Sequence, residues 1–171
     1  MDTWDAITAR RNVRAYSAEP LSAEDLNKIL EAARRAPSSR NAQWWDLIVV
    51  TDAADLGALS KVWMGAGHVA SSPATVAVIS PPGTDERQRA WIHYDLGQMT
   101  MQLMIAAADL GIASCHSAVE DEDLARSILG FPDDRECSSL ISLGYPEGRP
   151  LRPIMNPNRR EFSDVVHRDR W

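Results

Sequence analysis

The fold is decided by residues 85–111, which read DERQRAWIHYDLGQMTMQLMIAAADLG. Within this stretch, apolar side chains from Trp91 to Leu110 recur at spacings of mostly three and four residues, and Gly111 follows the last of them. This period is typical of one face of an α-helix, and a glycine commonly ends such a helix. The stretch therefore predicts one long helix over about 85–110, which we expect to be the central helix of the domain.

Shorter segments on both sides of this helix alternate between helical and extended patterns. A second clear helix begins after the capping residue Ser22, presents one apolar face and ends before Pro37. Further helices are predicted at about 2–9, after Asp52 and at about 121–129, and strands at about 45–50, 75–80, 112–117 and 138–145. Helices thus interleave with four strands, which indicates a layered α+β or α/β domain. With 171 residues, the chain is expected to form a single domain over 1–171.

The composition is that of a globular protein. Hydrophobic residues make up 44% and charged residues 25% of the chain, and no stretch approaches the roughly 18 consecutive apolar residues that a membrane helix needs. The N-terminus lacks the apolar run of a signal peptide. Cys115 and Cys137 are too few for a disulfide scaffold, so we expect both to be free thiols. We therefore expect a soluble, cytoplasmic protein.

The arginines are concentrated at the two ends of the chain. The net charge of −6 argues against a nucleic-acid or membrane-surface partner. Yet 12 of the 16 arginines lie in residues 1–40 and 149–171, and lysine occurs only twice. A planar guanidinium makes two parallel hydrogen bonds to a phosphate or carboxylate, which lysine cannot do. The distribution indicates an anion site; the alternative is scattered surface arginine, and the local context decides between them.

Several common catalytic and nucleotide-binding motifs are absent. The chain contains no G-x-G-x-x-G, G-x-x-x-x-G-K-[ST], G-x-S-x-G or H-E-x-x-H. Its four histidines are isolated, and its two cysteines lie 22 positions apart, without the spacing of metal ligands. Adjacent Cys115 and His116 point in divergent directions. We therefore expect no metal site, and the motifs favour neither the common hydrolases nor the common nucleotide folds.

The chain changes character after Tyr145. Prolines recur every three to four residues at Pro146, Pro150, Pro153 and Pro157, with arginines between them. This spacing forbids a regular helix and favours an extended arm over about 146–171. An arm needs a surface to lie against, and the sequence leaves open whether a partner subunit or the chain's own N-terminal half provides it.

Four stretches remain as candidates for a binding site. Residues 10–14 (RRNVR) place three arginines at a helix end, which indicates either a phosphate clamp or a solvated charge run. Residues 36–45 (APSSRNAQWW) form a polar loop that either contacts the edge of a heterocycle or simply turns from helix to strand. The other two are residues 95–115 and the segment from Asn158 to Trp171.

Taken in this order, the four stretches resemble the FMN-dependent nitroreductase family, of which this chain would be a short member. That family has an N-terminal R-x-S-x-[RK] stretch, a loop like A-P-S-x-x-N-x-Q-P-W and a C-terminal basic pair. Residues 95–112 look like its core helix, and residues 143–146 (LGYP) look like its late strand and turn. The resemblance spans nearly the whole chain.

The resemblance implies an α+β fold, in the form of a three-layer sandwich with a four- to five-stranded sheet flanked by helices. It also implies an intertwined homodimer that exchanges the arm over about 146–171. FMN is expected at the subunit interface, with its phosphate and ribityl chain held from both ends of the chain. The residues expected to bind it are Arg10, Arg11, Asn12, Arg14, Pro37, Ser38, Ser39, Asn41, Gln43, Arg159 and Arg160. No catalytic side chain is required, because the flavin carries the redox chemistry.

The chain departs from the family pattern at two positions. Asn12 stands where the family usually has Ser, and Trp44 where it usually has Pro. Asparagine keeps the hydrogen-bonding capacity, whereas Trp44 is expected to reshape the substrate pocket. Little length is available for the helical segment that larger members place over the flavin, and residues 62–68 are either a reduced lid or an ordinary connection.

The activity that the resemblance implies is FMN-dependent reduction of nitroaromatics, quinones or similar acceptors by NAD(P)H, in alternating half-reactions. The alternatives are a specialised flavoenzyme on the same scaffold (a dehalogenase, a natural-product dehydrogenase or a flavin-cleaving enzyme) and a flavin-binding protein without turnover. The sequence does not fix the preference for NADH or NADPH, because no acidic residue of a Rossmann motif and no arginine for a 2′-phosphate is identifiable.

Overall fold

The sheet forms the middle layer of the protein. The computed structural model describes residues 1–171, and its four strands pair antiparallel in the order β1-β2-β4-β3. The strands are β1 (Asp46–Val50), β2 (Ala74–Ser80), β3 (Ala113–Ser117) and β4 (Glu136–Gly144). Because every neighbouring pair is antiparallel, the fold is α+β, and the α/β alternative with its parallel sheet is excluded.

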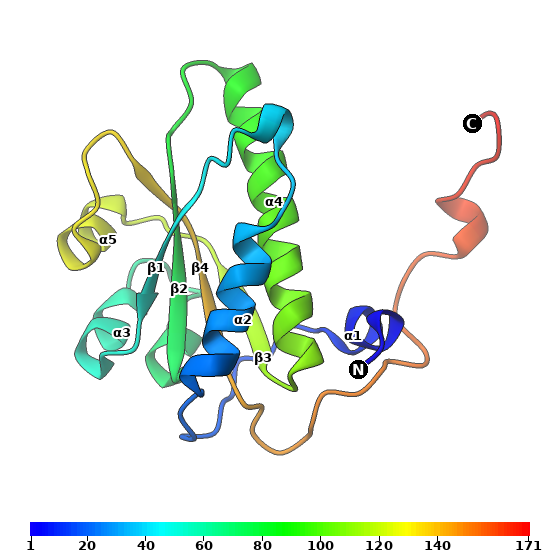
Figure 1. Cartoon of the computed structure of the whole chain (residues 1–171), viewed down its shortest axis with the longest axis horizontal. Coiled ribbons are helices and arrows are strands. Elements are labelled where there is room, and N and C mark those ends of the chain that lie inside the picture. The colour runs from blue at the N-terminus through cyan, green and yellow to red at the C-terminus, as the bar shows by residue number, and fades with distance from the viewer.

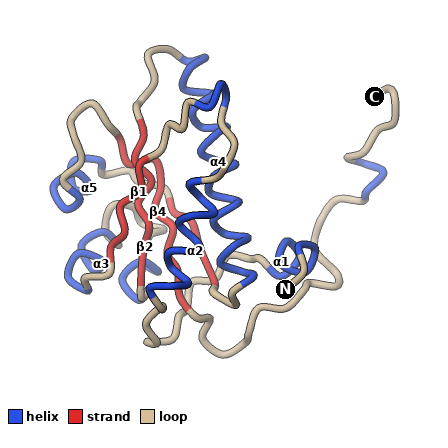
Figure 2. Tube along the Cα trace, viewed as in Figure 1, coloured by secondary structure: helices blue, strands red, loops and turns tan.

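Helices cover both faces of the sheet, with α2 and α4 on one face and α3 and α5 on the other (Figures 1 and 2). The α-helices are α1 (Thr3–Ala9), α2 (Ala23–Arg34), α3 (Ala53–Leu59), α4 (Glu86–Asp109) and α5 (Glu122–Leu129). Three short 3₁₀ helices are η1 (Ser39–Asn41), η2 (Gly67–Ser71) and η3 (Phe162–Asp164). The predicted helices and strands are confirmed, with ends within about two residues of the expected positions. The three-layer arrangement implied by the resemblance is confirmed as well.

Side-chain caps explain where the helices begin. The capping side chains, each of which accepts a hydrogen bond from a backbone N–H in the first turn, are Asp2, Ser22, Asp52, Asp85 and Asp121. Such a cap compensates a donor that has no partner inside the helix and contributes about 1 kcal/mol. After α4, Gly111 takes the left-handed φ of +74° that turns the chain back into β3.

The central helix α4 divides into a buried and an exposed face. Ile92, Met99 and Leu103 have no exposed surface and pack against α2 and the sheet. On the opposite face, Tyr94 is 68% and Met101 43% exposed. A helix that covers one sheet buries only the side chains at helical spacing on one side. The remaining face of α4 is therefore a surface feature.

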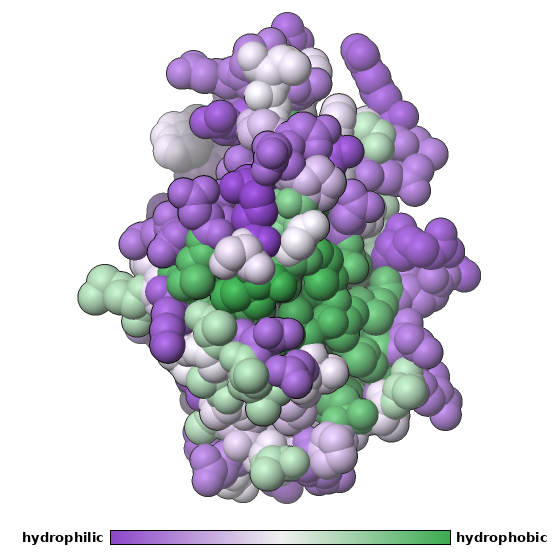
Figure 3. All heavy atoms as spheres, turned by 90° about the vertical axis from the view of Figure 1, so that its left-hand side faces the viewer, coloured by the Kyte–Doolittle hydropathy of each residue, from purple (hydrophilic) through white to green (hydrophobic).

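The face covered by α3 and α5 is less completely shielded. These helices have 7 and 8 residues, and they pack over a core that includes Leu59 and Leu140. Ile48, Trp63 and Val119 lie partly buried at its edge. Figure 3 shows a band of hydrophobic surface on this side of the molecule. The short helices therefore leave some apolar surface in contact with water.

The first part of the C-terminal arm lies against the chain's own N-terminal half. The backbone N–H of Glu147 donates to the carbonyl of Ala15 (3.0 Å), and that of Ile154 donates to Thr8 (3.1 Å). Leu151 is buried in a small cluster beside α1. Beyond this point the arm projects away from the body (Figure 1), and every residue from 155 to 171 is exposed. Contact with a partner subunit thus stays a prediction for residues 155–171.

Both cysteines are free and buried, as expected. Burial, aided by the nearby Glu122 carboxylate, raises the pKa of the Cys137 thiol to about 12, so this thiol is uncharged at neutral pH and a poor nucleophile. None of the helices combines the length and the apolar character needed to cross a membrane.

Gly144, the last residue of β4 before the arm, provides a test of how closely this part of the chain is packed. A β-carbon at Gly144 would lie 2.7 Å from Cδ of Pro73 and 2.8 Å from Cδ1 of Tyr16. We expect Gly144→Ala to lower the free energy of unfolding by about 1–3 kcal/mol, the usual range for overpacking, as measured by urea denaturation. The control is Gly57→Ala in α3, where nothing lies within 4 Å of the added carbon. That variant should be neutral or more stable by up to about 1 kcal/mol, and equal stabilities would contradict the close packing.

Candidate functional site

The N-terminal segment delivers two of the predicted residues to the edge of the sheet. After α1 the chain runs extended beside β3, where Asn12 pairs with Ser114 and the N–H of Val13 donates to the carbonyl of Ser114 (3.0 Å). Arg10 and Asn12 are thereby held side by side, and Nη1 of Arg10 donates to Oδ1 of Asn12 (3.4 Å). The predicted cluster of Arg10 and Asn12 exists in the folded chain.

These two side chains line a cleft between α4 and the sheet, which we call the β3 cleft. It has a volume of about 390 Å³. Its lining residues are Arg10, Asn12, His93, Leu96, Gly97, Thr100, Met101, Met104, His116, Ser138 and Ser139. The cleft is open because β3 is short: it pairs with β4 only from Leu140 to Gly144 and leaves the first half of β4 without a neighbour on that side. A bulge at Ser138 bends β4 at the same place.

The β3 cleft has the donor set of an anion site. None of its lining residues is acidic, and neither Arg10 nor the neighbouring Arg14 takes part in a salt bridge of the protein. Guanidinium groups that lack a carboxylate partner in an acidic protein suit a phosphate, which they bind through paired hydrogen bonds. The residues present therefore fit a phosphate-bearing cofactor.

A buried hydrogen-bond chain supports the segment that carries these residues. The Tyr16 hydroxyl donates to the carbonyl of Val13 (2.6 Å) and lies 2.7 Å from Oγ of Ser142, which in turn lies 2.7 Å from Nδ1 of His68. Burial, together with the positive charge of Arg14, lowers the pKa of His68. The imidazole is therefore neutral at neutral pH, and the chain of hydrogen bonds fixes the segment without adding charge.

Residues 37–43, the central part of the polar loop at 36–45, have a strained backbone. Arg40, Asn41 and Gln43 take positive φ angles of 56°, 57° and 50°. Residues other than glycine rarely adopt this left-handed conformation, and when they do it is often at binding sites, because surrounding contacts must hold it in place. Within the loop, the N–H of Gln43 donates to Oγ of Ser38 (2.9 Å) and its side-chain amide to the carbonyl of Asn41 (3.2 Å).

A buried carboxylate on α4 holds this loop. Asp95 has no exposed surface, and it accepts hydrogen bonds from the N–H of Ser39 (2.9 Å) and the indole N–H of Trp44 (3.1 Å). The hydroxyl of Ser39 and the amide of Gln98 also donate to it, at 3.4 and 3.2 Å. No salt bridge includes Asp95. Its charge is thus stabilised by hydrogen bonds alone, and these bonds connect the loop to the helix.

Trp44 has a role that the sequence did not indicate. That Trp44 reshapes the substrate pocket stays a prediction, while its indole N–H donates to Asp95 and its ring packs against the main core. Trp44 therefore supports the loop from inside.

The segment at residues 62–68 is held against the rest of the protein at its first residue. The carbonyl of Val62 accepts hydrogen bonds from the N–H groups of Glu120 (3.0 Å) and Asp121 (2.9 Å).

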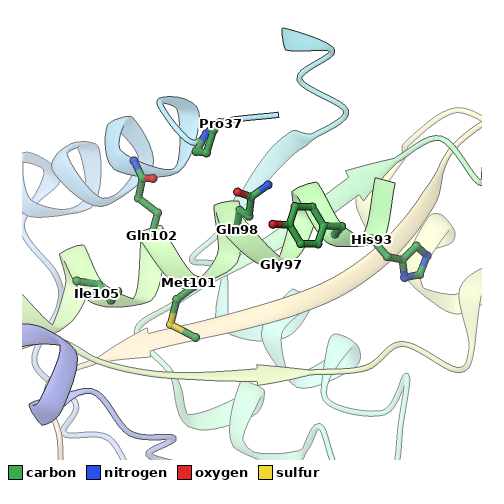
Figure 4. A pocket seen from close by; sticks show the side chains of 8 residues that line it. Pro37, His93, Gly97, Gln98, Met101, Gln102 and Ile105 are labelled. Carbon is green, nitrogen blue, oxygen red and sulfur yellow. The ribbon is translucent and has the colours of Figure 1, made fainter. Parts of the chain in front are cut away.

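The loop opens onto a second cleft, which we call the α4 groove (Figure 4). The groove has a volume of about 670 Å³, and Pro37 is its only contribution from the loop. All other lining residues come from α4: His93, Tyr94, Gly97, Gln98, Met101, Gln102 and Ile105. His93, Gly97 and Met101 also line the β3 cleft. The two clefts therefore adjoin along the exposed face of α4.

The structure brings together only some of the predicted site residues. Arg10 and Asn12 share the β3 cleft, and Arg14 lies close enough to His68 to lower its pKa. The loop residues form a cluster of their own that reaches the α4 groove through Pro37. The side chain of Arg11 turns away from the β3 cleft, and the exposed Arg159 and Arg160 bond only to backbone carbonyls of the arm itself.

Residues 95–115 are a candidate stretch in the sequence, but sequence reasoning gave no individual role to Asp95 or to the α4 residues that line both clefts, and His93 lies outside that stretch. Asp95 carries the clearer signal, since it is an acidic residue at a position of α4 that the helical period assigns to the buried face. Gly97 is a second weak signal, because a glycine inside a helix usually has a packing or functional reason. His116 and Ser138 have no sequence signal, because only the pairing of the strands brings them to the cleft.

Comparisons with known proteins identify the family and the fold. The sequence matches the profile of the Nitroreductase family over residues 7–66 and 55–145. A protein of Archaeoglobus fulgidus with the provisional name NADH dehydrogenase/NAD(P)H nitroreductase is 32% identical over 169 residues, covering 96% of each chain. An NADH dehydrogenase of Thermus thermophilus is 29% identical, covering 88% of this chain and 90% of its own. The solved structure of an FMN-dependent nitroreductase from Clostridium difficile, 25% identical, superposes with a TM-score of 0.83 and covers 97% of this chain and 99% of that one.

The fold is thus that of an oxidoreductase of the nitroreductase type. The chain belongs to the nitroreductase family, and the family resemblance seen in the sequence is confirmed.

Removing the Asp95 carboxylate should release the loop. Asp95→Ala leaves the N–H of Ser39 and the indole of Trp44 without acceptors, and we expect the free energy of unfolding to fall by about 1–3 kcal/mol. Trypsin should also cleave after Arg40 faster than in the wild type, because the loop opens locally. The control is Asp109→Ala on the same helix, whose exposed carboxylate pairs only with the N-terminus and should change stability by less than about 1 kcal/mol. An unchanged cleavage rate in Asp95→Ala would show that the loop does not depend on this carboxylate.

Proposed function

We propose that this protein binds FMN and uses NAD(P)H to reduce nitroaromatics, quinones or similar acceptors in alternating half-reactions. The observation that carries the proposal is the β3 cleft, where Arg10 and Asn12 lie together with no acidic residue among the lining side chains. In a chain with a net charge of −6, this exception indicates an anionic ligand. Membership of the family, and the FMN dependence named for the Clostridium difficile relative, support FMN as that ligand.

The phosphate of FMN is assigned to the arginine end of the cleft. Arg10 supplies a guanidinium and Asn12 an amide, both already positioned by the pairing of the N-terminal segment with β3. Arg159 and Arg160 make no salt bridge, are exposed and donate only to backbone carbonyls of the arm itself. They are therefore free to complete the phosphate site when the arm docks.

The ring of FMN is assigned to the neighbourhood of Arg14 and the loop residues Pro37, Ser38, Ser39, Asn41 and Gln43. A cation such as Arg14 stabilises negative charge that develops on the reduced ring. The loop offers backbone and amide groups in a fixed, left-handed conformation, which lowers the entropy lost on binding. When bound, FMN supplies the transfer of electrons from the nicotinamide to the acceptor. The tasks of the protein are to bind and orient the cofactor and to shield it from water.

We propose further that the protein acts as a homodimer built on the exposed face of α4. Tyr94 and Met101 expose apolar surface there, and Gly97 between them leaves room, since a β-carbon at this position meets nothing within 4 Å. The arm carries Phe162 and Trp171, which are 70% and 100% exposed in the single chain. Exposed apolar side chains of this size mark surfaces that become covered. In such a dimer, the loop of one subunit lies over the β3 cleft of the other.

The cofactor assignment is tested by the visible spectrum of protein that has been incubated with FMN and then gel-filtered. The wild type should retain a flavin spectrum. Arg10→Ala and Arg159→Ala should lower the affinity for FMN by about 10- to 100-fold, because each removes a charge-assisted hydrogen bond to the phosphate. Arg168→Ala is the matched control, an arginine of the same arm that is outside the proposed site, and should retain FMN.

A colourless wild-type protein would overturn the proposal. If FMN is retained, steady-state oxidation of NADH and NADPH with menadione or a nitrofuran tests the activity. Absence of turnover would indicate a flavin-binding protein, and oxygen-dependent loss of the flavin spectrum would indicate a flavin-cleaving enzyme.

The proposed dimer is tested at Gly97. Gly97→Leu adds a side chain whose β-carbon meets no atom within 4 Å in the single chain but that would separate two α4 helices packed face to face. We expect the variant to be folded and monomeric in analytical ultracentrifugation. Gly57→Leu is the control, because it adds the same side chain at an equally open position on α3, and it should remain dimeric. A Gly97→Leu protein that is still a dimer would place the interface elsewhere.

A further inference from the structure

Three arginines from opposite ends of the chain surround a pocket that is distinct from the β3 cleft. We call it the arginine pocket; its volume is about 600 Å³. It is lined by 6 residues: Arg11, Arg149, Pro150, Arg152, Pro153 and Ile154. Half of the lining residues are thus arginines, and none is acidic. Arg10 and Arg11 are consecutive, yet their side chains line different pockets, because successive side chains of an extended backbone point to opposite sides.

The walls of the arginine pocket are fixed by contacts within the chain. Arg11 Nη2 donates to the carbonyl of Pro150 (3.3 Å) and Nη1 to that of Ala9 (3.5 Å). The buried Leu151 side chain and the hydrogen bond from Ile154 N–H to the Thr8 carbonyl (3.1 Å) hold the arm against α1. Two prolines in the wall also restrict the backbone. The pocket therefore needs little rearrangement to receive a ligand.

The three guanidinium groups of this pocket are not neutralised by the protein. None of them takes part in a salt bridge, whereas Arg34, Arg35 and Arg126 elsewhere in the chain pair with carboxylates. Acidic residues outnumber basic ones, 24 to 18, so a carboxylate partner would have been easy to provide. Like charges held close together repel one another, and an anion that enters between them relieves this repulsion. The arrangement favours a ligand with more than one negative charge.

We propose that the arginine pocket binds a phosphate dianion. A phosphate carries a charge of about −1.5 to −2 at pH 7 and offers three acceptor oxygens, which matches three guanidinium donors better than a single carboxylate does. Two sources have this chemistry: free inorganic phosphate, and a phosphomonoester on a nucleotide, such as the 2′-phosphate that distinguishes NADPH from NADH. This site is separate from the one proposed for the FMN phosphate, and its assignment does not depend on FMN binding.

The proposal is tested by isothermal titration of the full-length protein with inorganic phosphate and, separately, with adenosine 2′-monophosphate, in both cases after incubation with FMN and removal of the excess by gel filtration. The wild type should bind at least one of these anions with one site per chain. Arg149→Gln/Arg152→Gln should bind it at least about tenfold more weakly, because two charge-assisted contacts are lost. Arg168→Gln/Arg170→Gln makes the same change of net charge on the exposed tail and should bind as the wild type does.

The outcomes separate the two sources and can overturn the proposal. Equal affinities for the two anions assign the pocket to free phosphate, and tight binding of adenosine 2′-monophosphate alone assigns it to a nucleotide. Absence of saturable binding to the wild type, or equal loss of binding in both double variants, would overturn the site. If the pocket variant does not fold, the single change Arg152→Gln at an exposed side chain replaces it. Retention of FMN by the pocket variant keeps this result independent of the flavin assignment.

Discussion

The strained loop at residues 37–43 depends on one buried carboxylate. Asp95 sits inside the protein without a cationic partner, and the N–H of Ser39 and the indole of Trp44 supply the hydrogen bonds that its charge requires. A buried charge without such donors would be strongly unfavourable, so neither the helix nor the loop is stable in this form without the other. The three residues at positive φ, Arg40, Asn41 and Gln43, lie between these two contacts along the chain. The position of α4 and the conformation of the loop therefore depend on each other.

The place of the clefts follows from the unequal lengths of the elements around them. The 24 residues of α4 extend over about 36 Å, whereas the five residues of β3 extend over only about 17 Å. The helix therefore runs past the end of the edge strand, and the first half of β4 lacks a neighbour there. The extended segment with Arg10 and Asn12 fills only part of this space. A length mismatch between secondary structures has thus left a cleft that Arg10 and Asn12 line.

Several features of the single chain support the proposed dimer. The exposed face of α4 joins both clefts, and the tail that carries Arg159 and Arg160 is exposed and projects away from the body. A protein of this size has enough core to fold with these surfaces exposed. In a single chain, the loop and the arginines do not surround the same volume. This incompleteness is the physical argument for the proposed dimer.

The sequence by itself determined the elements and their type. The period of residues 85–110, the cap at Ser22 and the apolar runs of the strands are local signals, because each depends on residues within a few positions of one another. The motif order also indicated the family, which the comparisons confirm. Only the tertiary structure decided the antiparallel strand order, the partners of Asp95 and the separation of Arg10 from Arg11 into different pockets. These depend on contacts between residues far apart in the chain, and such contacts leave no periodic trace in the sequence.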